Sequence, residues 1–483
     1  MAGRKDLVVV GGGTAGLVAA VGAAGQGART VLIERHRTGG DCLWTGCVPS
    51  KALITAAAAA HAARDSSHLG VHVDEVRVDF AAVMAHVKDA IATIEPHDSP
   101  ERLRREGVEV VHGDARFVGR DLVEVDGQRI RFRRALIATG SSPVVPGIPG
   151  LAEADPLTSE SLWDLDVLPE RLVVLGGGPI GSELGQAFAR LGAKVTLVEM
   201  IDRLLPREEP EASAIIAASL TADGVDVCTG HRAVRVVDPT GPAPRLLVEG
   251  PGGEDEIGFD RILVAVGRRP RTAGLGLEFA GVELDERGAV AADDRLRTSN
   301  PRIYAAGDVT MKLPFTHVAS THGATVVQNA LFGLRARVDH DRIPWVTFTA
   351  PEVARVGLSS AEAQERFGAG ATVRTAAHVG LDRAIAAGDT GGFAQLIGDD
   401  KGRIVGATVV GPRAGETIGE VVAWMAGGAK VSAISRSSTH AYPTWNDDLS
   451  AASLEQLRVS LAKVKPFARV LLAVRRLFDR KER

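Results

Sequence analysis

Two of the chain's three cysteines, Cys42 and Cys47, lie close together in the segment GGDCLWTGCVPSKAL, with four residues between them. Two thiols at this spacing can bind a metal ion, form a structural disulfide, or cycle between a dithiol and a disulfide. A close pair in a reducing compartment is more typical of catalysis or metal binding than of a structural bridge. Cys228 is the only other cysteine, so a cysteine-rich metal site would lack its remaining ligands, and no metal site is predicted. Cys228 itself, in GVDVCTG, is predicted to be a small apolar residue in a strand.

The elements that position this pair belong to a long chain of ordinary composition. A length of 483 residues predicts about two to four domains. The formal net charge of −4 gives no general attraction to nucleic acid, which is therefore not expected as a partner. The sequence shows neither a signal peptide nor an uninterrupted apolar run long enough to span a membrane. We therefore expect a cytoplasmic protein.

A glycine-rich turn precedes the cysteine segment. Gly11, Gly13 and Gly16 fit G-x-G-x-x-G between a predicted buried strand and a predicted helix, and a second strand, TVLIE, ends at Glu34, 18 residues after Gly16. The glycines let the backbone approach a pyrophosphate, the helix N-terminus supplies N–H donors, and the acid accepts from a ribose 2′-hydroxyl. The segment predicts a dinucleotide-binding unit.

The same layout recurs later in the chain. Gly176, Gly178 and Gly181 precede the strand KVTLVE, which ends at Glu199, again 18 residues after the last glycine. Two fingerprints indicate two dinucleotides and hence electron transfer between them, such as that between a flavin and a nicotinamide. A carboxylate at Glu199 would repel a 2′-phosphate and favours NADH over NADPH, although Arg203 is near enough in sequence to weaken this preference.

Three further apolar runs are predicted to be strands that end in turns. They are RALIATGSSP (134–143), RILVAVGRRP (261–270) and NPRIYAAGDVT (300–310). The last contains Asp308, and a carboxylate at the carboxyl end of a strand can accept hydrogen bonds from ligand hydroxyls. An isolated Asp is more often a cap or turn residue, but the neighbouring nucleotide motifs favour a ligand role.

These motifs resemble the flavoprotein disulfide reductases, a family that includes dihydrolipoyl dehydrogenase, glutathione reductase and mercuric reductase. Both fingerprints, GGDCLWTGCVPSK, ATGSSP, VGRRP and YAAGD occur in family order, and the resemblance covers essentially residues 5–455. Segments such as FTHVASTHGATVVQNALF and PWVTFTAPEVARVGL are similar to the mercuric-reductase-like branch. The resemblance implies a homodimer with FAD at the first fingerprint and NADH or NADPH at the second.

The resemblance also implies roles for individual residues. Cys47 would face the flavin as the charge-transfer thiol, Cys42 would meet the substrate, Lys51 would lie beside the flavin N5 edge and pair with Glu183, and Asp308 would bind the ribityl chain. The cofactor-binding residues carried over from the family's motifs are Gly11, Gly13, Thr14, Ala15, Gly16, Glu34, Gly40, Lys51, Thr139, Gly140, Gly176, Gly178, Gly181, Glu199, Gly267, Asp308 and His317.

The carboxyl-terminal motif SSTHAYPTWNDDL (437–449) departs from the disulfide-reductase pattern. The family's His before Pro-Thr, which exchanges a proton with the substrate-facing thiol, is Tyr442 here, and the family's Glu is Asp447. Tyr titrates near ~10 and His near ~6.5, so Tyr442 can donate to a thiolate but is a poor resting base. Mercuric reductases also carry Tyr at this position, and thiolates bind soft metals directly.

His440 is a second candidate for the proton carrier. In an extended segment residues i and i+2 share a face, so His440 could replace the missing base; a histidine packed or hydrogen-bonded at the subunit interface fits the sequence equally well. The predicted catalytic residues are thus Cys42, Cys47, Lys51, Glu183, His440, Tyr442 and Asp447. Mercuric reductases proper also carry a cysteine pair near the carboxyl terminus, which this sequence lacks, so mercury is not expected to be the physiological acceptor.

Residues 454–483 form a basic segment, with nine Lys or Arg and three acids, a net charge of +6. Pro466 is predicted to start a helix. The apolar residues that share one face of this helix are Phe467, Val470, Leu471, Val474, Leu477 and Phe478. Such a helix can lie on an anionic membrane or dock on protein, and docking on the chain's own fold or on a partner is favoured.

The sequence predicts an α/β fold with two Rossmann-like dinucleotide-binding domains and an α+β dimerisation domain. The expected boundaries are 1–148 with 270–345 for FAD, 149–269 for NAD(P), 346–453 for the interface and 454–483 for the tail. The expected function is hydride transfer from NAD(P)H through FAD and the Cys42–Cys47 disulfide to a disulfide, soft-metal or other electrophilic small-molecule acceptor. The alternatives are a dihydrolipoyl dehydrogenase, a diaphorase or quinone reductase that does not use the thiols, and a non-catalytic partner in an assembly.

Overall fold

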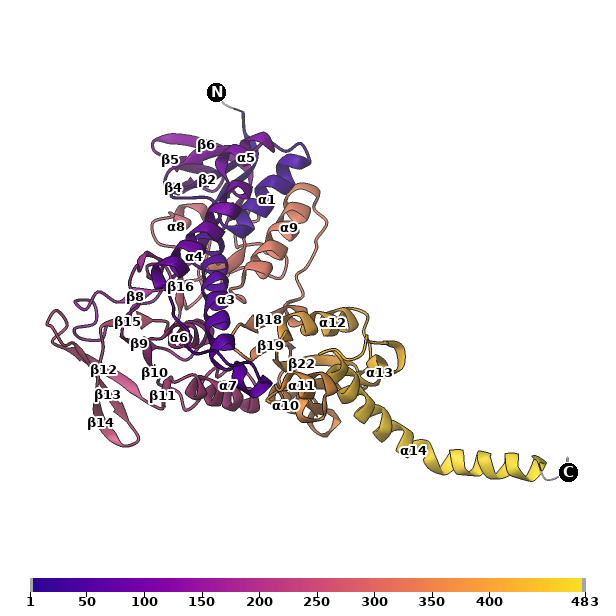
Figure 1. The fold of residues 1–483 in the computed structure, drawn as a ribbon. Helices are drawn as coiled ribbons and strands as arrows, with labels where there is room; N and C mark the ends of the chain where they lie inside the picture. Colours follow the sequence, from indigo (N-terminus) through magenta and orange to yellow (C-terminus); the bar gives the residue numbers. More distant parts are fainter. Residues whose placement is uncertain (1–2, 480–483) are drawn as a thin grey trace. The chain divides into compact units, whose positions relative to one another are not determined.

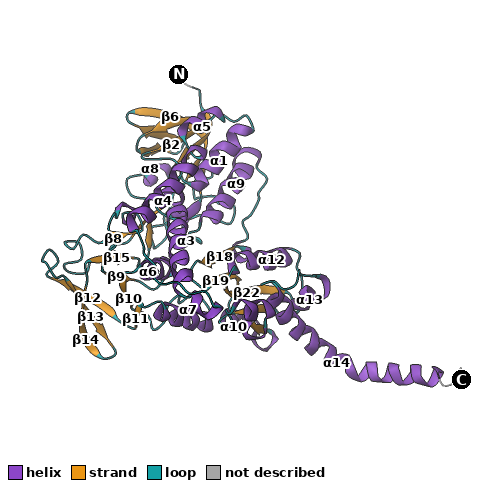
Figure 2. Ribbon diagram, in the orientation of Figure 1, coloured by secondary structure: helices purple, strands orange, loops and turns teal. Residues whose placement is uncertain are grey.

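The computed structural model describes residues 3–479, and these residues form two compact units (Figures 1 and 2). The first unit extends to Leu205 and resumes over Leu220–His340. The second contains Pro206–Ser219 and the residues from Asp341 onward.

A seven-stranded sheet forms the centre of one part of the first unit. Its strand order is β3 (Glu109–His112), β2 (Thr30–Glu34), β1 (Lys5–Val10), β6 (Gln128–Ile137), β5 (Leu122–Val125) and β4 (Ala115–Gly119), and β17 (Ile303–Ala305) also pairs with β6. The strands β3, β2, β1 and β17 run parallel to one another and to the end of β6. Their carboxyl ends therefore meet at one edge, where Gly11, Thr139 and Asp308 follow them in sequence.

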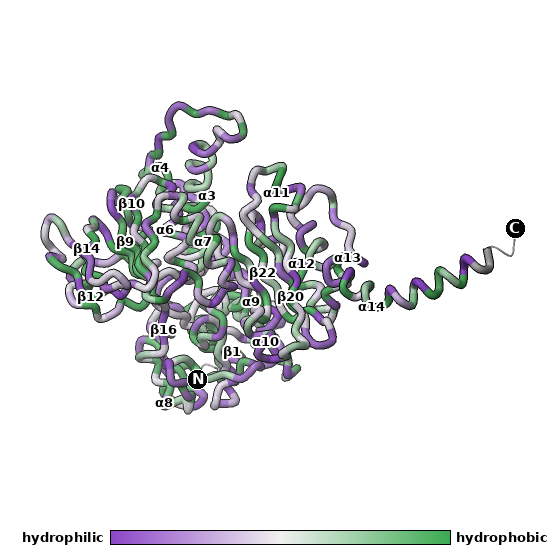
Figure 3. Tube along the Cα trace, turned by 90° about the horizontal axis from the view of Figure 1, so that it is seen from below, coloured by the Kyte–Doolittle hydropathy of each residue, from purple (hydrophilic) through white to green (hydrophobic). Residues whose placement is uncertain are grey.

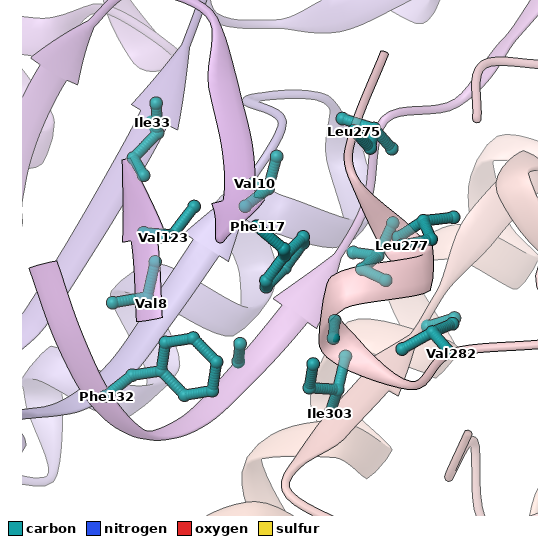
Figure 4. Close-up of a cluster of buried hydrophobic side chains, with 14 of the residues drawn as sticks. Val8, Val10, Ile33, Phe117, Val123, Phe132, Leu275, Leu277, Val282 and Ile303 are labelled. Atoms are coloured by element: carbon teal, nitrogen blue, oxygen red, sulfur yellow. The ribbon is translucent and has the colours of Figure 1, made fainter. Parts of the chain in front are cut away.

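A buried apolar core packs on one face of this sheet (Figure 4). Val8 and Val10 point to this face because alternate residues of a strand share a side, and they pack with Ile33. Phe117 and Phe132 meet edge to face with ring centroids 6.0 Å apart, and both are fully buried. Burial of each such side chain stabilises the folded state by about 1.5–3 kcal/mol. This packing holds in place the sheet that carries the first glycine turn.

Three smaller sheets complete the first unit. A parallel sheet has the order β11 (Asp226–Thr229), β10 (Lys194–Glu199), β9 (Arg171–Leu175), β15 (Arg261–Val264) and β8 (Leu157–Thr158). An antiparallel sheet contains β12 (Arg232–Val237), β13 (Arg245–Gly250) and β14 (Gly253–Gly258), and a short ladder pairs β16 (Arg268–Pro270) with β7 (Ser141–Pro143). Each of the two parallel arrangements is a Rossmann-like dinucleotide-binding fold, as the sequence predicts.

The second unit contains an antiparallel five-stranded sheet. Its order is β18 (Pro344–Thr347), β19 (Glu352–Gly357), β22 (Ile404–Gly411), β21 (Phe393–Gly398) and β20 (Thr372–Ala377). Buried side chains of this sheet pack with Ile418, Val421 and Leu449 from helices of the same unit. This is the α+β arrangement that the sequence predicts for the dimerisation domain.

The α-helices of the described chain fall in both units. In the first unit they are α1 (Thr14–Gly25), α2 (Gly40–Trp44), α3 (Cys47–Arg64), α4 (Phe80–Ile94), α5 (Pro100–Arg105), α6 (Pro179–Leu191), α8 (Leu277–Ala280) and α9 (Thr316–Phe332). In the second they are α10 (Ser360–Phe367), α11 (Asp382–Ala387), α12 (Ala414–Ala426), α13 (Ile434–Ser437) and α14 (Asp447–Asp479), and α7 (Pro210–Ala222) contributes to both. Among the described residues no helix is both long enough and apolar enough to cross a membrane.

Helix α14 corrects the prediction that a helix starts at Pro466. The helix begins at Asp447 and continues through Pro466 to Asp479. The first turns of α14 are anchored by the buried residues Leu449 and Ala452, and good helix formers follow them. The helix therefore continues through Pro466, where it lacks one backbone N–H donor.

The distal half of α14 is not covered by the chain's own fold. Every side chain that the structure describes between Leu461 and Arg476 is exposed. Phe467 is 73% and Val470 is 63% exposed, and hydrophobic and hydrophilic residues alternate along this part of the helix (Figure 3). The described side chains of this half make no buried contact within the single chain, and docking on a partner stays a prediction. Leu477 and Phe478 of the predicted apolar face, and residues 480–483, lie outside the described side chains.

Candidate active site

The turn between β1 and α1 can form only with glycine at two of its positions. Gly11 has φ +107°, and a Cβ on it would lie 2.3 Å from the carbonyl oxygen of Ala138. A Cβ on Gly16 would lie 1.9 Å from the carbonyl oxygen of Gly11. Gly13, the N-cap of α1, gives no side-chain cap, so the first amides of the helix are available as anion donors.

The second glycine turn repeats this geometry. Gly176 has φ +103°, and a Cβ on Gly181 would lie 1.9 Å from the carbonyl oxygen of Gly176. Gly178 caps α6 without a side-chain hydrogen bond, and no protein atom lies within 4 Å of the Cβ position at Gly178. The open side of this turn has the shape and the donors that a pyrophosphate requires.

The two acids that follow these turns are held in matching positions. Glu34 Oε2 accepts from the Gly12 amide at 2.6 Å, and its Oε1 accepts from the His36 amide at 2.8 Å. Glu199 Oε2 accepts from the Gly177 amide at 2.6 Å, and its Oε1 accepts from the amide of Ile201 at 2.8 Å. Each carboxylate is fixed beside its glycine turn, where it can accept from a ribose hydroxyl.

Asp308 lies in a polar network at the end of β17. Its Oδ2 accepts from Ser141 Oγ at 2.7 Å and lies 3.9 Å from Nε of Arg268. Burial raises the pKa of Asp308, although Ser141 and Arg268 act in the opposite direction. Arg268 also pairs with Asp41, the residue before Cys42. This arginine thus connects the cysteine turn to the carboxylate at the edge of the sheet.

The remaining predicted cofactor residues lie around these turns. Gly40 has φ +61° and approaches Gly13 so closely that a Cβ on it would lie 2.7 Å from the Gly13 Cα. Thr139 Oγ1 donates to the carbonyl of Arg271 at 2.7 Å. The other positions are Thr14 and Ala15 in the first turn of α1, Gly140 (φ +72°) and Gly267 (φ +137°) in turns, and His317, whose ring stacks on Phe315 with centroids 5.6 Å apart.

The two cysteines lie on adjacent helices. Cys42 lies in α2 and is half-buried, whereas Cys47 is the first residue of α3 and is exposed. Thr316 Oγ1 lies 3.1 Å from the Cys47 sulfur. A helix N-terminus stabilises negative charge, so this position favours a thiolate at Cys47.

The two thiols of the pair differ in pKa. Hydrogen bonding from Cys42 lowers the pKa of Cys47 to about 6, and Thr316 and Lys51 act in the same direction against the effects of burial and of Glu183. The same hydrogen bond, together with burial, raises the pKa of Cys42. In the reduced pair, Cys47 is the thiolate at neutral pH and Cys42 keeps its proton.

Lys51 lies one turn after Cys47 on α3. Its Nζ donates to Glu183 Oε2 at 2.7 Å and to Ser50 Oγ at 3.3 Å. Glu183, on α6, is buried, so the ion pair joins α3 to the second glycine-turn helix. By contrast, Cys228 lies half-buried in β11, as the sequence predicts, and burial raises its pKa to about 11.

Tyr442 and His440 lie in the irregular segment between α13 and α14, and their side chains have different partners. Tyr442 is 75% exposed, and its hydroxyl donates to Asp382 Oδ2 at 2.6 Å. This hydrogen bond raises the pKa of Tyr442. The phenol is therefore a donor at neutral pH, and its base form is even less accessible than that of a free tyrosine.

His440 is packed among polar neighbours in the second unit. Its Nε2 lies 2.9 Å from Glu420 Oε1 and 3.1 Å from Ser438 Oγ, and its Nδ1 lies 3.1 Å from Ser450 Oγ. Asp447 Oδ1 is 3.8 Å from Nδ1, and Asp447 Oδ2 accepts from the Thr444 amide at 3.0 Å. Both ring nitrogens thus have partners within the unit.

Several contact residues are absent from the set predicted from sequence. Arg268, Asp41 and Ser141 connect the cysteine turn to Asp308, and Thr316 contacts Cys47. Arg268, Asp41 and Ser141 lie inside the quoted motifs VGRRP, GGDC and ATGSSP, so these motifs could have identified them as site residues. Glu420 lies 20 residues from its partner His440 and Asp382 lies 60 residues from Tyr442, and both are outside any motif.

Comparisons with known proteins agree with this geometry. Residues 5–323 match the family described as pyridine nucleotide-disulphide oxidoreductase, and residues 343–453 match its dimerisation domain. The chain is 39% identical to a mercuric reductase from Streptomyces lividans, over 93% of this chain and 95% of that protein. It is 36% identical to a dihydrolipoyl dehydrogenase from Thermus scotoductus, over 93% of this chain and 96% of that protein.

Two solved structures share the fold of this chain. A Cu(II) complex of the HOCl-induced flavoprotein disulfide reductase RclA from Escherichia coli has a TM-score of 0.80 at 29% identity, covering 93% of this chain and 99% of that one. LpdA from Mycobacterium tuberculosis has a TM-score of 0.84 at 28% identity, covering 93% of this chain and 99% of that one.

The residues present fit the two dinucleotides of this family. The uncapped amides of α1, the narrow turn at Gly11 and the fixed carboxylate of Glu34 suit the ADP half of FAD, and the matching features at Gly178 and Glu199 suit NAD(P)H. The dimerisation-domain match supports a homodimer. The chain belongs to the class I pyridine nucleotide-disulfide oxidoreductases and is an FAD-dependent NAD(P)H oxidoreductase that acts on sulfur groups.

Proposed function

We propose that this enzyme reduces a soft metal ion or another electrophilic acceptor through the Cys42–Cys47 pair. The observation that carries the proposal is the difference in pKa between the two thiols. Cys47 is held as a thiolate with a pKa of about 6, and Cys42 keeps a proton beside it. FAD, when bound, supplies the two-electron chemistry that connects NAD(P)H to this pair. Lys51, paired with Glu183, places a positive charge beside the Cys47 thiolate.

The acceptor step uses the dithiol. Cys42 loses its proton, both sulfurs bind the acceptor as thiolates, two electrons pass to the acceptor, and a disulfide bond closes between the two sulfurs. Because Cys47 is already a thiolate at neutral pH, this step releases one proton. A soft metal ion bonds to sulfur without acid–base help. Attack on a disulfide substrate instead requires a base that takes the proton of Cys42 and, as its conjugate acid, returns it to the leaving thiolate. The phenol of Tyr442, whose pKa is raised, can donate but is a poor base.

The names of the relatives support a metal acceptor. Mercuric reductases are among them, and the RclA structure is a Cu(II) complex. The test is a comparison of mercuric ion, Cu(II), lipoamide and glutathione disulfide as acceptors with NADH as donor. We expect metal reduction that requires both cysteines, and slow disulfide reduction. Fast lipoamide reduction would support the second candidate, a dihydrolipoyl dehydrogenase, a name that other relatives carry.

The proposed dimer places Tyr442 of one protomer at Cys42 of the partner subunit, as the family resemblance implies. His440 is assigned a structural role in this proposal because both ring nitrogens are engaged by Glu420, Ser438 and Ser450. NADH is the proposed donor, because the Glu199 carboxylate is fixed beside Gly177, where a 2′-phosphate would meet its charge.

The exposed half of α14 is proposed to contact an anionic membrane surface. At about 100° per residue, Phe467, Val470 and Val474 lie on one face, while Arg469 and Arg476 lie opposite. Residues 464–476 contain four basic residues and no acid. An apolar face with a basic back is the pattern of helices that lie in the interface of anionic lipid. A protein partner is the alternative that the vesicle experiment below distinguishes.

A further inference from the structure

A second polar site lies in the first unit, away from the glycine turns. A cavity of about 420 Å³ is lined by Arg134, Arg295, Arg297, Arg302, Arg335 and Tyr304. A volume of this size is typical of pockets for small molecules. Five guanidinium groups around one cavity are unusual because like charges repel one another.

The topology separates this cavity from the dinucleotide sites. Arg134 pairs in register with Leu7 near the amino end of β1, and Arg302 immediately precedes β17. Gly11 and Asp308, by contrast, follow the carboxyl ends of these parallel strands. The arginines therefore line the opposite edge of the sheet from the first glycine turn.

The charge of this cavity is not balanced by the protein. Within residues 3–479, no carboxylate lies at ion-pair distance from any of the five arginines. Other arginines of the same strand do have such partners: Arg131 pairs with Asp121 at 3.5 Å and Arg133 with Asp6 at 3.2 Å. The Nε atom of Arg134 is also buried without a hydrogen-bond partner. Buried polar groups normally have partners. The Nη1 atom of Arg134 donates to the carbonyl of Arg133 at 3.1 Å, and its Nε is left able to donate to an anion.

The backbone that carries the arginines is held in place before any ligand arrives. The buried side chain of Asn329 donates to the carbonyls of Arg295 at 3.1 Å and Ala336 at 2.9 Å, and accepts from the Ala336 amide at 2.7 Å. The backbone of Arg297 forms an isolated antiparallel β-bridge with the backbone of Tyr304. Arg335 adopts φ +58°, a conformation that costs energy for a residue with a side chain. Such strain at a pre-formed site is typical of ligand-binding loops.

We propose that this cavity binds a small molecule with several phosphate groups, of the class of inorganic polyphosphate or a nucleoside triphosphate. Guanidinium groups form paired hydrogen bonds with phosphate oxygens, and five of them match an anion of high charge. Arg297, Arg302 and Arg335 are exposed, so the pocket opens to solvent and a small anion can enter it directly. This site goes beyond the proposed electron transfer and is independent of it, because none of its lining residues belongs to the cysteine pair or the glycine turns.

The test measures binding of inorganic tripolyphosphate and ATP to the FAD-loaded full chain by calorimetry, with saturating NAD⁺ present to occupy the second dinucleotide site. We expect binding that weakens as salt rises. Arg297→Gln with Arg335→Gln should weaken it about 100-fold, or about tenfold for each arginine. The matched control Arg129→Gln removes a charge from the same strand β6 outside the cavity, where Arg129 pairs with Glu124, and should change affinity less than about twofold.

Several results would overturn the proposal. They are the absence of binding by the wild type, equal binding by the double variant, loss of binding when NAD⁺ is present, and length-dependent binding of single-stranded DNA that exceeds tripolyphosphate binding. Equal affinity for tripolyphosphate and ATP assigns the site to inorganic polyphosphate chemistry, and tighter ATP binding assigns it to nucleotides. Thermal unfolding keeps the test valid for a less stable variant: tripolyphosphate should raise the Tm of the wild type and the control but not that of the double variant.

Discussion

The low pKa of Cys47 should depend on the thiol of Cys42 as a hydrogen-bond donor. Cys42→Ala removes this donor, while Cys42→Ser keeps an O–H group at the same place and serves as the matched control. A hydrogen bond to a charged group is worth about 1.5–3 kcal/mol, and one pKa unit corresponds to about 1.4 kcal/mol. Because Cys47 is exposed, the lower end applies, and we expect the alanine variant to raise its pKa by about one unit.

The assay is the rate of Cys47 alkylation by iodoacetamide in the reduced enzyme as a function of pH, read by peptide mass spectrometry. Only the thiolate reacts, so a wild-type pKa of about 6 predicts a rate that rises through pH 6 and levels above pH 7. A rise of one unit makes alkylation at pH 6 about fivefold slower in Cys42→Ala. Cys228, with its pKa raised to about 11, is an internal slow reference. Equal pH profiles for the alanine and serine variants would refute the assigned hydrogen bond.

Four further predictions follow from the same contacts. Glu199→Ala should reduce the preference for NADH over NADPH in kcat/KM, and a wild type that strongly prefers NADPH would contradict the role of Glu199. Tyr442→His with Asp447→Glu should raise lipoamide reduction more than either change alone, while Tyr442→Phe should lower turnover of a soft-metal acceptor; lipoamide turnover in the wild type that already equals that of a dihydrolipoyl dehydrogenase would contradict the assignment. His440→Ala should lower the Tm without altering the pH profile of turnover, and a changed profile would instead make His440 the proton carrier. Hydrogen bonds lower the pKa of Glu420 in the fold against the effect of burial, so the stability that they contribute is present above the unfolded pKa near 4.5 and is lost as pH falls. The Tm difference between the variant and the wild type should therefore shrink in acid. A chain that ends at Ser460 should lose binding to vesicles of anionic lipid, and wild-type binding should weaken with salt because screening shortens to about 8 Å at physiological ionic strength; equal vesicle binding by the two chains would assign the exposed half of α14 to another partner.

The sequence predicts best those parts that rest on local backbone rules. The turns at Gly11 and Gly176 admit only glycine, and the strands that precede them are buried apolar runs, so spacing alone identifies them. The half-buried Cys228 in β11 follows from the same kind of pattern. Each of these features depends on neighbours within about 20 residues.

The parts that the sequence does not predict depend on distant contacts. The partners of His440 and Tyr442 come from α12 and α11, and the carboxyl-terminal motif contains neither partner. The helix through Pro466 persists because its first turns are anchored by packing that begins at Asp447. The arginine cavity draws its lining from β6, the segment before β17 and the end of α9, and no sequence motif joins these three.

Electrons should reach the acceptor through Cys42 and Cys47. The decisive experiment measures NADH-dependent reduction of mercuric ion or Cu(II) by Cys42→Ser, together with stopped-flow reduction of the bound flavin by NADH in the same variant. We expect flavin reduction to continue while acceptor turnover falls by at least about 100-fold, because an essential nucleophile is lost. Acceptor turnover equal to that of the wild type would contradict it and would show a diaphorase that does not use the thiols.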